Sequence, residues 1–359
     1  MTPFASKLKF IDTHVNPDIK RDRLAPDISI YPNADQPNGD NKTDFEKMDL
    51  FVELKKPAES DPFCDPDARD RQPRDFLFFE KVSKDAQLVR GQLASYAAAL
   101  AGSRFRVHTF CVLVCGLYAR FIRWDRDGAT VTRRFNYIDE PHLLAGFFWR
   151  YDHLDRRQQG HDTSVSSLTS EDIQQIQHFE DFEERLRLDN RDHREFRILI
   201  VPDRNKPEDE KRFVVSFPQK YTARSPFGRA TRPMLAFDME KGTIVFLKDY
   251  WRADVNGMEK EGEIYAILES KDVPNIPPFG KGNDVRDHTT LTQTLRGEEW
   301  ACWSKDMVPL RHYRMSLDVV ARHLTSFRSS HEFVSAIADA MEGKTSFADF
   351  THMTNCWLA

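Results

Sequence analysis

The chain has 359 residues, 40% of them hydrophobic and 12% aromatic, which is enough for two domains with separate cores. Its net charge of −5 gives no overall attraction to nucleic acid or to an anionic membrane surface. The longest apolar run, residues 110–117, is too short to span a bilayer, and the five cysteines lack zinc-type pairing. These features exclude a membrane partner and indicate an intracellular protein, cytoplasmic or nuclear.

The first region alternates predicted strands with one predicted helix, so we expect an α/β (α+β) fold. Asp27 precedes a short strand, and residues 49–55 form a second, buried strand. Alternation along this strand places Glu53 and Lys55 on the same face. A helix over residues 85–101 follows, and then strands over residues 107–117, 118–124 and 129–136.

An aspartate before a strand that carries Glu-x-Lys, followed by a helix with Gln-x-x-x-Tyr, resembles the PD-(D/E)xK nuclease superfamily. The resemblance implies that Asp27 and Glu53 hold a divalent metal ion, that Lys55 orients the attacking water, and that Gln92 braces the site. Oxygen ligands of this kind suit Mg²⁺ or Mn²⁺. A charged pair on the solvent face of a strand is also common without any metal site. In addition, a protein can keep a nuclease fold after it has lost catalytic activity. A shared fold without cleavage therefore stays open beside a working nuclease.

The middle of the chain is typical of a connector. Residues 167–189 carry helix signals with charges mixed along one flank, which favours a solvated helical connector. The string Gly160-His161-Asp162-Thr163 precedes it and has no purpose that can be derived from the residues alone. None of the twelve histidines lies in a His-Glu-x-x-His or Cys/His cluster, so the spacing predicts no zinc site.

Residues 227–268 combine a turn, a hairpin and a helix. Gly228 lies in the turn, and an apolar run over residues 233–237 pairs with a β-branched run over residues 243–249. Lys248 lies near the end of the second strand, and Glu263 lies on a predicted amphipathic helix over residues 259–268. Protein kinases hold the α- and β-phosphates of ATP with a strand lysine that a helix glutamate fixes. On their own, these residues favour an ordinary hairpin and helix with a surface lysine and a solvated glutamate.

Seven strings in a fixed order change that interpretation. They are residues 90–97, 121–125, 147–151, 228–232, 246–252, 262–265 and 312–314. In this order they resemble the fungal-type protein kinase family, over residues 24 to about 343. The resemblance implies that Lys248 contacts the phosphates of ATP, that Glu263 pairs with it, and that Gly228 lies above the nucleotide. The loop departs from the usual Gly-x-Gly-x-x-Gly because it keeps one glycine and adds Arg229 and Arg232.

The sequence contains no His-Arg-Asp catalytic loop and no Asp-Phe-Gly magnesium site, since Thr351 follows Asp349-Phe350. Phosphoryl transfer depends on these groups to position the substrate and neutralise charge. We therefore expect the chain as written to be a truncated member of the family without kinase turnover. At most, it would act as a nucleotide-binding or interaction module. The resemblance implies ATP and Mg²⁺ as cofactors. The alternative is a Mg²⁺-dependent nuclease that acts through the first domain. A nucleic acid partner belongs only to that alternative.

The predicted domains follow from these patterns. They are a PD-(D/E)xK-like domain over residues 1–160, a helical connector over 161–193, a kinase-like N-lobe with the hinge and first C-lobe helices over 194–343, and a divergent tail over 344–359. In kinases the helices beyond the hinge pack on a second lobe. We therefore expect residues 331–359 to be poorly packed, partly disordered or covered by a protein partner, with Phe333, Ile337 and Trp357 not densely buried.

Overall fold

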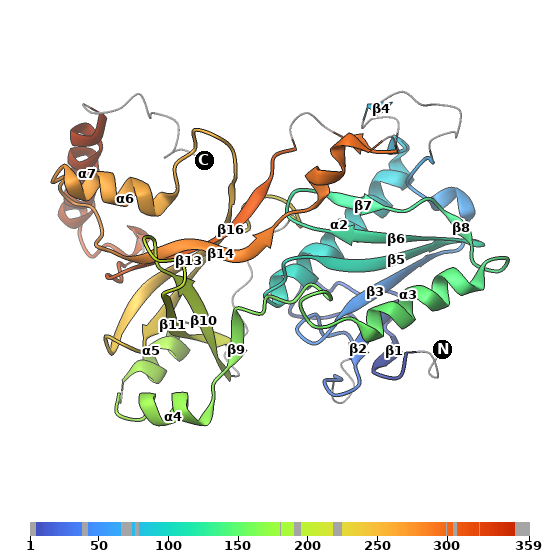
Figure 1. Cartoon of the computed structure of the whole chain (residues 1–359), viewed down its shortest axis with the longest axis horizontal. Coiled ribbons are helices and arrows are strands. Elements are labelled where there is room, and N and C mark those ends of the chain that lie inside the picture. Colours follow the sequence, from blue (N-terminus) through green and yellow to red (C-terminus); the bar gives the residue numbers. More distant parts are fainter. Residues whose placement is uncertain are drawn as a thin grey trace.

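The computed structural model describes residues 5–37, 42–65, 74–75, 79–179, 181–189, 195–217, 225–298, 300–303, 307–322 and 324–348. Within them the chain forms two seven-stranded sheets. The mixed α/β character is as predicted. Figure 1 shows the two sheets as the centres of two lobes that lie side by side. The first lobe carries the first sheet with α2 and α3, and the second lobe carries the second sheet with α4 to α7.

The first sheet has the strand order β1-β2-β3-β5-β6-β7, and β8 pairs with β6. The parallel neighbours β3 and β5 are joined by the long helix α2 (Lys84–Ser103), because parallel strands need a crossover connection. The other pairs in this sheet are antiparallel. The strands are β1 (Leu8–Asp12), β2 (Ile28–Pro32), β3 (Leu50–Lys55), β5 (Thr109–Cys115), β6 (Tyr118–Trp124), β7 (Ala129–Val131) and β8 (Phe135–Asn136).

Helices cover both faces of the first sheet. Phe51 of β3 packs in the core on the α2 side, whereas Leu50 and Val52 pack on the other side with Phe148 of α3 (Pro141–His153). Because side chains alternate along a strand, the residues two and four positions after Phe51 also face α2. The polar end of β3 is therefore directed at the helix that carries Gln92.

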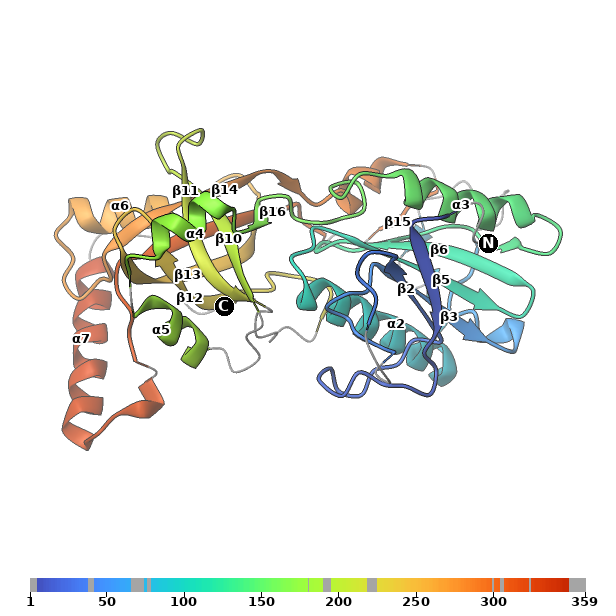
Figure 2. The same cartoon turned by 90° about the horizontal axis from the view of Figure 1, so that it is seen from below.

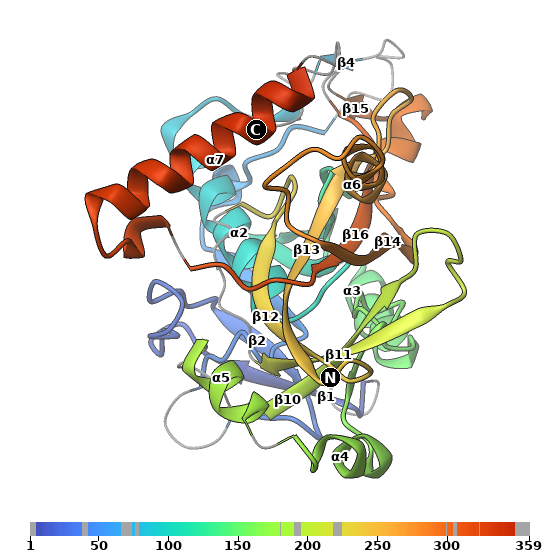
Figure 3. The ribbon, with the colours of Figure 1, turned by 90° about the vertical axis from the view of Figure 1, so that its left-hand side faces the viewer.

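The second sheet is antiparallel, with the order β14-β16-β13-β12-β11-β10-β9. It twists strongly between β13 and β10 (Figure 3). Strand β10 also contacts β14 and β16. Its inner face forms a core with Phe105 of the first lobe. The strands are β9 (Val165–Ser167), β10 (Glu195–Pro202), β11 (Glu210–Phe217), β12 (Arg232–Asp238), β13 (Thr243–Ala253), β14 (Phe279–Thr289) and β16 (Leu310–Leu317).

Three helices pack on the outer face of the second sheet. The short helices α4 (Ser170–Ile176) and α5 (Phe182–Asp189) cover Val214 and Phe237. Helix α6 (Glu261–Ser270) follows β13 and precedes β14, and its Tyr265 packs on Tyr250 and Tyr313. A strand with a lysine, with a glutamate-bearing helix as the next element in the chain, is the order found in protein kinases.

Two elements differ from those predicted near the domain boundaries, and the boundaries themselves stay predictions. The region predicted as a helical connector contributes β9, which pairs with β10 and so adds a strand to the second sheet. The backbone of β9 provides hydrogen-bond partners for the N–H and C=O groups along the edge of β10. Helix α7 (Ser330–Ala348) continues through the boundary predicted at residue 343.

Helix α7 lies at the edge of the second lobe away from the first lobe (Figure 2). Its apolar side chains stay accessible, with Phe333 37% and Ile337 38% exposed, as expected for these two residues. Trp357 lies outside the described residues, and a protein partner that covers α7 stays a prediction. Among the described residues, no helix is both long enough and apolar enough to cross a bilayer.

The lobes meet at the turn between β6 and β7. The Asp125 carboxylate accepts the backbone N–H groups of Leu291 at 2.8 Å and Thr292 at 3.1 Å, where the 3₁₀ turn η2 (Thr292–Gly297) begins. The short strands β4 (Arg74–Asp75) and β15 (Cys302–Trp303) also pair in parallel. Two further 3₁₀ turns are η1 (Ala58–Ser60) and η3 (Leu324–Ser326).

Candidate functional site

The first candidate site lies between β13 and α6. Alternation along β13 directs Lys248 and Tyr250 toward α6, where Lys248 Nζ lies 2.9 and 2.7 Å from the two carboxylate oxygens of Glu261. The Tyr250 hydroxyl donates to the same carboxylate at 2.7 Å. Burial, and then the charge of Glu261, raise the pKa of Tyr250, so its hydroxyl stays protonated. The Lys248 and Glu261 side chains are 25% and 26% exposed, so a ligand can reach them.

The predicted pairing of Lys248 with Glu263 is wrong, because Glu261 takes that place. The helix begins at Glu261, two residues later than predicted. Two residues along a helix turn a side chain by about 200°, so Glu263 points away from Lys248. Its carboxylate instead accepts the Lys260 backbone N–H at 2.9 Å and caps the helix.

The loop with Gly228 contacts the first lobe. The Gly228 N–H donates to the Arg126 carbonyl at 2.8 Å, and the Phe227 ring lies 5.8 Å from the ring of Trp124. Gly228 has a φ of +82°, which favours glycine, although an added Cβ would meet nothing within 4 Å. The next residue, Arg229, lies over the Tyr250 ring at 5.0 Å. Arg229 is therefore the loop residue beside the Lys248–Glu261 pair.

The second predicted arginine of this loop has a structural role. Arg232 is buried and donates to the Ala101 carbonyl of the first lobe at 2.7 Å. Its guanidinium also lies over the Phe105 ring. Arg232 thus joins the two lobes and does not face α6.

The second candidate site lies between β3 and α2 of the first lobe. Lys55 Nζ donates to Glu53 Oε1 at 2.5 Å and to Gln92 Oε1 at 2.9 Å. Gln92 Nε2 in turn donates to the Tyr96 hydroxyl at 2.8 Å, which donates to the Ala25 carbonyl. The Glu-x-Lys strand and the Gln-x-x-x-Tyr helix therefore meet in one hydrogen-bonded chain.

Asp27 lies beside this chain, since its carboxylate accepts the backbone N–H of Leu54 at 2.7 Å. Burial raises the pKa of Glu53 to about 7, and the charge of Asp27 adds to the shift while Lys55 opposes it. The Glu53 side chain is 2% exposed, yet its Oε2 has no hydrogen-bond partner among the described residues. A free, buried carboxylate oxygen near a second carboxylate fits a hard divalent cation such as Mg²⁺ or Mn²⁺.

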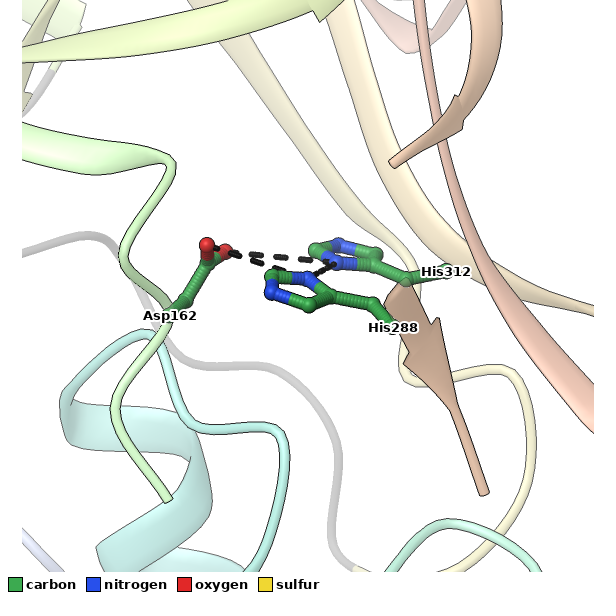
Figure 4. A group of neighbouring side chains, drawn as sticks. All are labelled: Asp162, His288 and His312. Atoms are coloured by element: carbon green, nitrogen blue, oxygen red, sulfur yellow. Dashed lines mark hydrogen bonds and ion pairs between the residues drawn. The ribbon is translucent and has the colours of Figure 1, made fainter. Parts of the chain in front are cut away.

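A third group was missed by the sequence reasoning. Asp162, His288 and His312 are all buried and come from the segment before β9, from β14 and from β16 (Figure 4). The preceding Gly160 has a φ of +94°, and a Cβ there would lie 2.0 Å from the His108 carbonyl oxygen. This close approach explains the glycine of the Gly160-His161-Asp162-Thr163 string. The other available signal was His312 within one of the kinase-like strings, but no spacing links it to the other two residues.

Residues 79–352 match the fungal protein kinase family, which is more than half of the chain. The chain belongs to this family. The match to the fungal protein kinase family includes Gly228, Lys248 and Glu261, and it begins after Glu53 and Lys55. Comparisons with curated proteins and with solved structures gave no match. The nuclease resemblance of the first lobe therefore stays a prediction.

Proposed function

We propose that this fungal protein kinase family member binds ATP through Lys248, with Glu261 as the carboxylate that holds the lysine. The observation that carries the proposal is the two-oxygen contact between Lys248 and Glu261 across β13 and α6. A strand lysine held by the following helix is the arrangement with which kinases grip the α- and β-phosphates. Mg²⁺ would accompany the nucleotide as its usual counter-ion.

The charges near the site also support a polyphosphate ligand. Lys248 Nζ lies 4.7 Å and the Arg229 guanidinium 5.0 Å from the centre of the Tyr250 ring. Two cations therefore lie against the Tyr250 ring, and of the two only Lys248 pairs with the Glu261 carboxylate. The excess positive charge favours an anion, and the loop backbone at Gly228 lies next to these side chains.

We propose that these 359 residues bind the nucleotide but do not transfer its phosphoryl group. Their sequence has no His-Arg-Asp loop and no Asp-Phe-Gly site to supply the catalytic carboxylate and the metal ligands. Each such group contributes several kcal/mol of transition-state stabilisation. The chain by itself is therefore a nucleotide-binding or interaction module.

MgATP is expected to raise the melting temperature of the wild-type chain. At a nucleotide concentration about 100 times the Kd, the added stability is about 2.7 kcal/mol. Lys248→Ala and Glu261→Ala should each abolish most of this shift, because the phosphates lose their cation or the cation loses its anchor. The measurement is a thermal melt with and without MgATP.

Glu263→Ala is the matched comparison, since it removes an acid from the same helical turn without touching Lys248. It should lower the melting temperature slightly through the lost cap and leave the MgATP shift intact. A shift of equal size in the wild type and Lys248→Ala would refute the proposal. So would a shift that is lost in Glu263→Ala and kept in Glu261→Ala.

A second function is supported by the geometry of the first lobe. We propose that this lobe hydrolyses phosphodiester bonds of nucleic acid with Mg²⁺ or Mn²⁺, and that Asp27 and Glu53 would hold the ion. Such an ion activates water and offsets the charge that develops on the phosphate. Lys55, placed between Glu53 and Gln92, would orient the attacking water, and Gln92 keeps the lysine in place.

Duplex DNA incubated with the wild-type chain and Mg²⁺ or Mn²⁺ is expected to be cut. Lys55→Ala and Glu53→Ala should each slow the cleavage about 10²- to 10⁴-fold, because a water-orienting group or an ion ligand is lost. Lys56→Ala, which alters the adjacent exposed lysine, should cut at the wild-type rate. Absence of cleavage by the wild type with either ion, or cleavage unchanged in Glu53→Ala, would exclude this function.

A further inference from the structure

Asp162, His288 and His312 direct their polar atoms into one small buried space (Figure 4). The two Nδ1 atoms lie 3.0 Å apart. The Asp162 carboxylate oxygens lie 3.8 Å from His288 Nδ1 and 3.9 Å from His312 Nδ1. These separations bring three candidate ligand atoms close enough to share one metal ion with bonds of about 2.0 to 2.2 Å.

The hydrogen bonds of His312 identify which ring nitrogen carries the hydrogen. His312 Nε2 lies 2.5 Å from Asp249 Oδ1, and the same oxygen accepts from Arg314 Nε at 2.7 Å. A carboxylate oxygen that accepts from an arginine is an acceptor, so His312 Nε2 carries the hydrogen. A neutral imidazole protonated at Nε2 has its lone pair on Nδ1, and this atom faces His288 and Asp162.

The surroundings hold the three side chains in place. Metal-binding histidines usually donate their second ring N–H to a carboxylate, as His312 does to Asp249. Asp162 accepts the Ser164 backbone N–H at 2.9 Å and also binds Arg314. Arg314 is fully buried and contacts both carboxylates, so neither Asp162 nor Asp249 is free to turn away.

We propose that Asp162, His288 and His312 bind a transition-metal ion of the zinc type at the junction of the two lobes. Imidazole and carboxylate ligands suit Zn²⁺ and chemically related divalent ions better than Mg²⁺ or Ca²⁺. Three protein ligands leave a fourth position. An anionic ligand there would offset the charge of the ion, because Arg314 and Arg232 already offset the charges of Asp162 and Asp249.

The site would join the lobes, since Asp162 lies in the segment that leaves the first lobe and both histidines lie in the second sheet. The proposed site differs from the expectation of no zinc site, which rested on ligands close together in the sequence. His288 and His312 are 24 residues apart, on neighbouring strands, and Asp162 comes from another segment. No short spacing could have indicated this set.

The test uses the full chain, first stripped of metal with a chelator and then titrated with Zn²⁺, Fe²⁺, Mn²⁺ or Co²⁺ alone. We expect one equivalent of Zn²⁺ to bind and to raise the melting temperature. Mg²⁺ should not bind at this site. Co²⁺ should give the visible absorption of a low-coordinate site. His288→Ala should weaken binding more than about 100-fold. His142→Ala, which removes an exposed histidine of α3, should bind like the wild type.

His288→Cys keeps the proposal testable if the alanine variant does not fold. A thiolate can replace the imidazole, so this variant should still bind Zn²⁺, and Co²⁺ should add a sulfur charge-transfer band in the near ultraviolet. The competing arrangement is a proton shared between His288 and His312, without any ion. A wild-type chain that binds none of the four ions, or a His288→Ala variant that binds Zn²⁺ as tightly as the wild type, would overturn the proposal.

Discussion

Replacement of Arg314 by methionine is expected to lower the free energy of unfolding by about 3 to 5 kcal/mol. Arg314 is fully buried on β16 and binds the carboxylates of Asp162 and Asp249. It also donates to the Ile200 carbonyl at 3.1 Å. Methionine fills much of the volume but leaves the buried Asp162 carboxylate without its arginine and Asp249 with only the more distant Arg232, at 4.0 Å. Removing one partner is the costly way to break a buried ion pair. The change is measured as the shift in the midpoint of urea unfolding.

Arg311→Met is the matched control on the same strand. Arg311 is 41% exposed and pairs with Asp254 at 2.9 Å, so its loss should cost at most about 1 kcal/mol. Equal losses in the two variants would show that the buried network does not stabilise the fold in this way.

The Arg314 effect should also depend on pH. Burial disfavours ionisation of Asp162, but Arg314 and the nearby histidines outweigh it and lower its pKa to about 2. A depressed carboxylate pKa contributes stability above the unfolded-state pKa near 4, and that stability is lost as the pH falls toward 2. The difference between wild type and Arg314→Met should therefore shrink in acid.

Glu53→Gln is expected to stabilise the metal-free chain at pH 8. The pKa of Glu53 is raised to about 7 in the folded chain, chiefly by burial, from an ordinary value of 4.5. A raised carboxyl pKa makes folding less favourable as the pH rises from 4.5 to 7, because the unfolded chain ionises first. The penalty is fully present above pH 7 and is on the order of 3 kcal/mol. Glutamine cannot ionise, so the Glu53→Gln variant does not lose this stability at high pH.

The measurement is urea unfolding in buffer with EDTA at pH 5 and at pH 8. Glu53→Gln should gain stability over the wild type only at pH 8, and Glu59→Gln, at an exposed acid of η1, should match the wild type at both. Mn²⁺ added at pH 8 should stabilise the wild type and not Glu53→Gln, because the ion replaces the proton on the carboxylate. A Glu53→Gln variant less stable than the wild type at pH 8 would contradict the raised pKa.

Local patterns in the sequence determined which residues share an element and a face. The two-residue period of a strand placed Glu53 and Lys55 together, and the structure confirms that both face the helix that carries Gln92. The β-branched run over residues 243–249 placed Lys248 on a strand that precedes a helix with acidic residues, and these are β13 and α6. These predictions held because backbone geometry within one strand sets the direction of its side chains.

The choice between Glu261 and Glu263 required the tertiary structure. Gly262 N–H donates to the Tyr313 hydroxyl at 2.9 Å, and a Cβ on Gly262 would lie 2.6 Å from that oxygen. This close contact between helix and sheet sets the rotation of α6 and directs Glu261 at Lys248. Two acids two positions apart in a sequence cannot reveal this rotation, because Tyr313 lies 51 residues away.

The buried group of Asp162, His288 and His312 was likewise decided by packing alone. Its members lie on separate elements and meet only because the second sheet twists and closes against the segment that leaves the first lobe. The sequence by itself determined the kinase-like order of strand lysine and helix, the α/β character and the face of each strand. Which side chains meet across elements depended on how the elements pack, since that is set by contacts distant in the chain and not by the period of any one element.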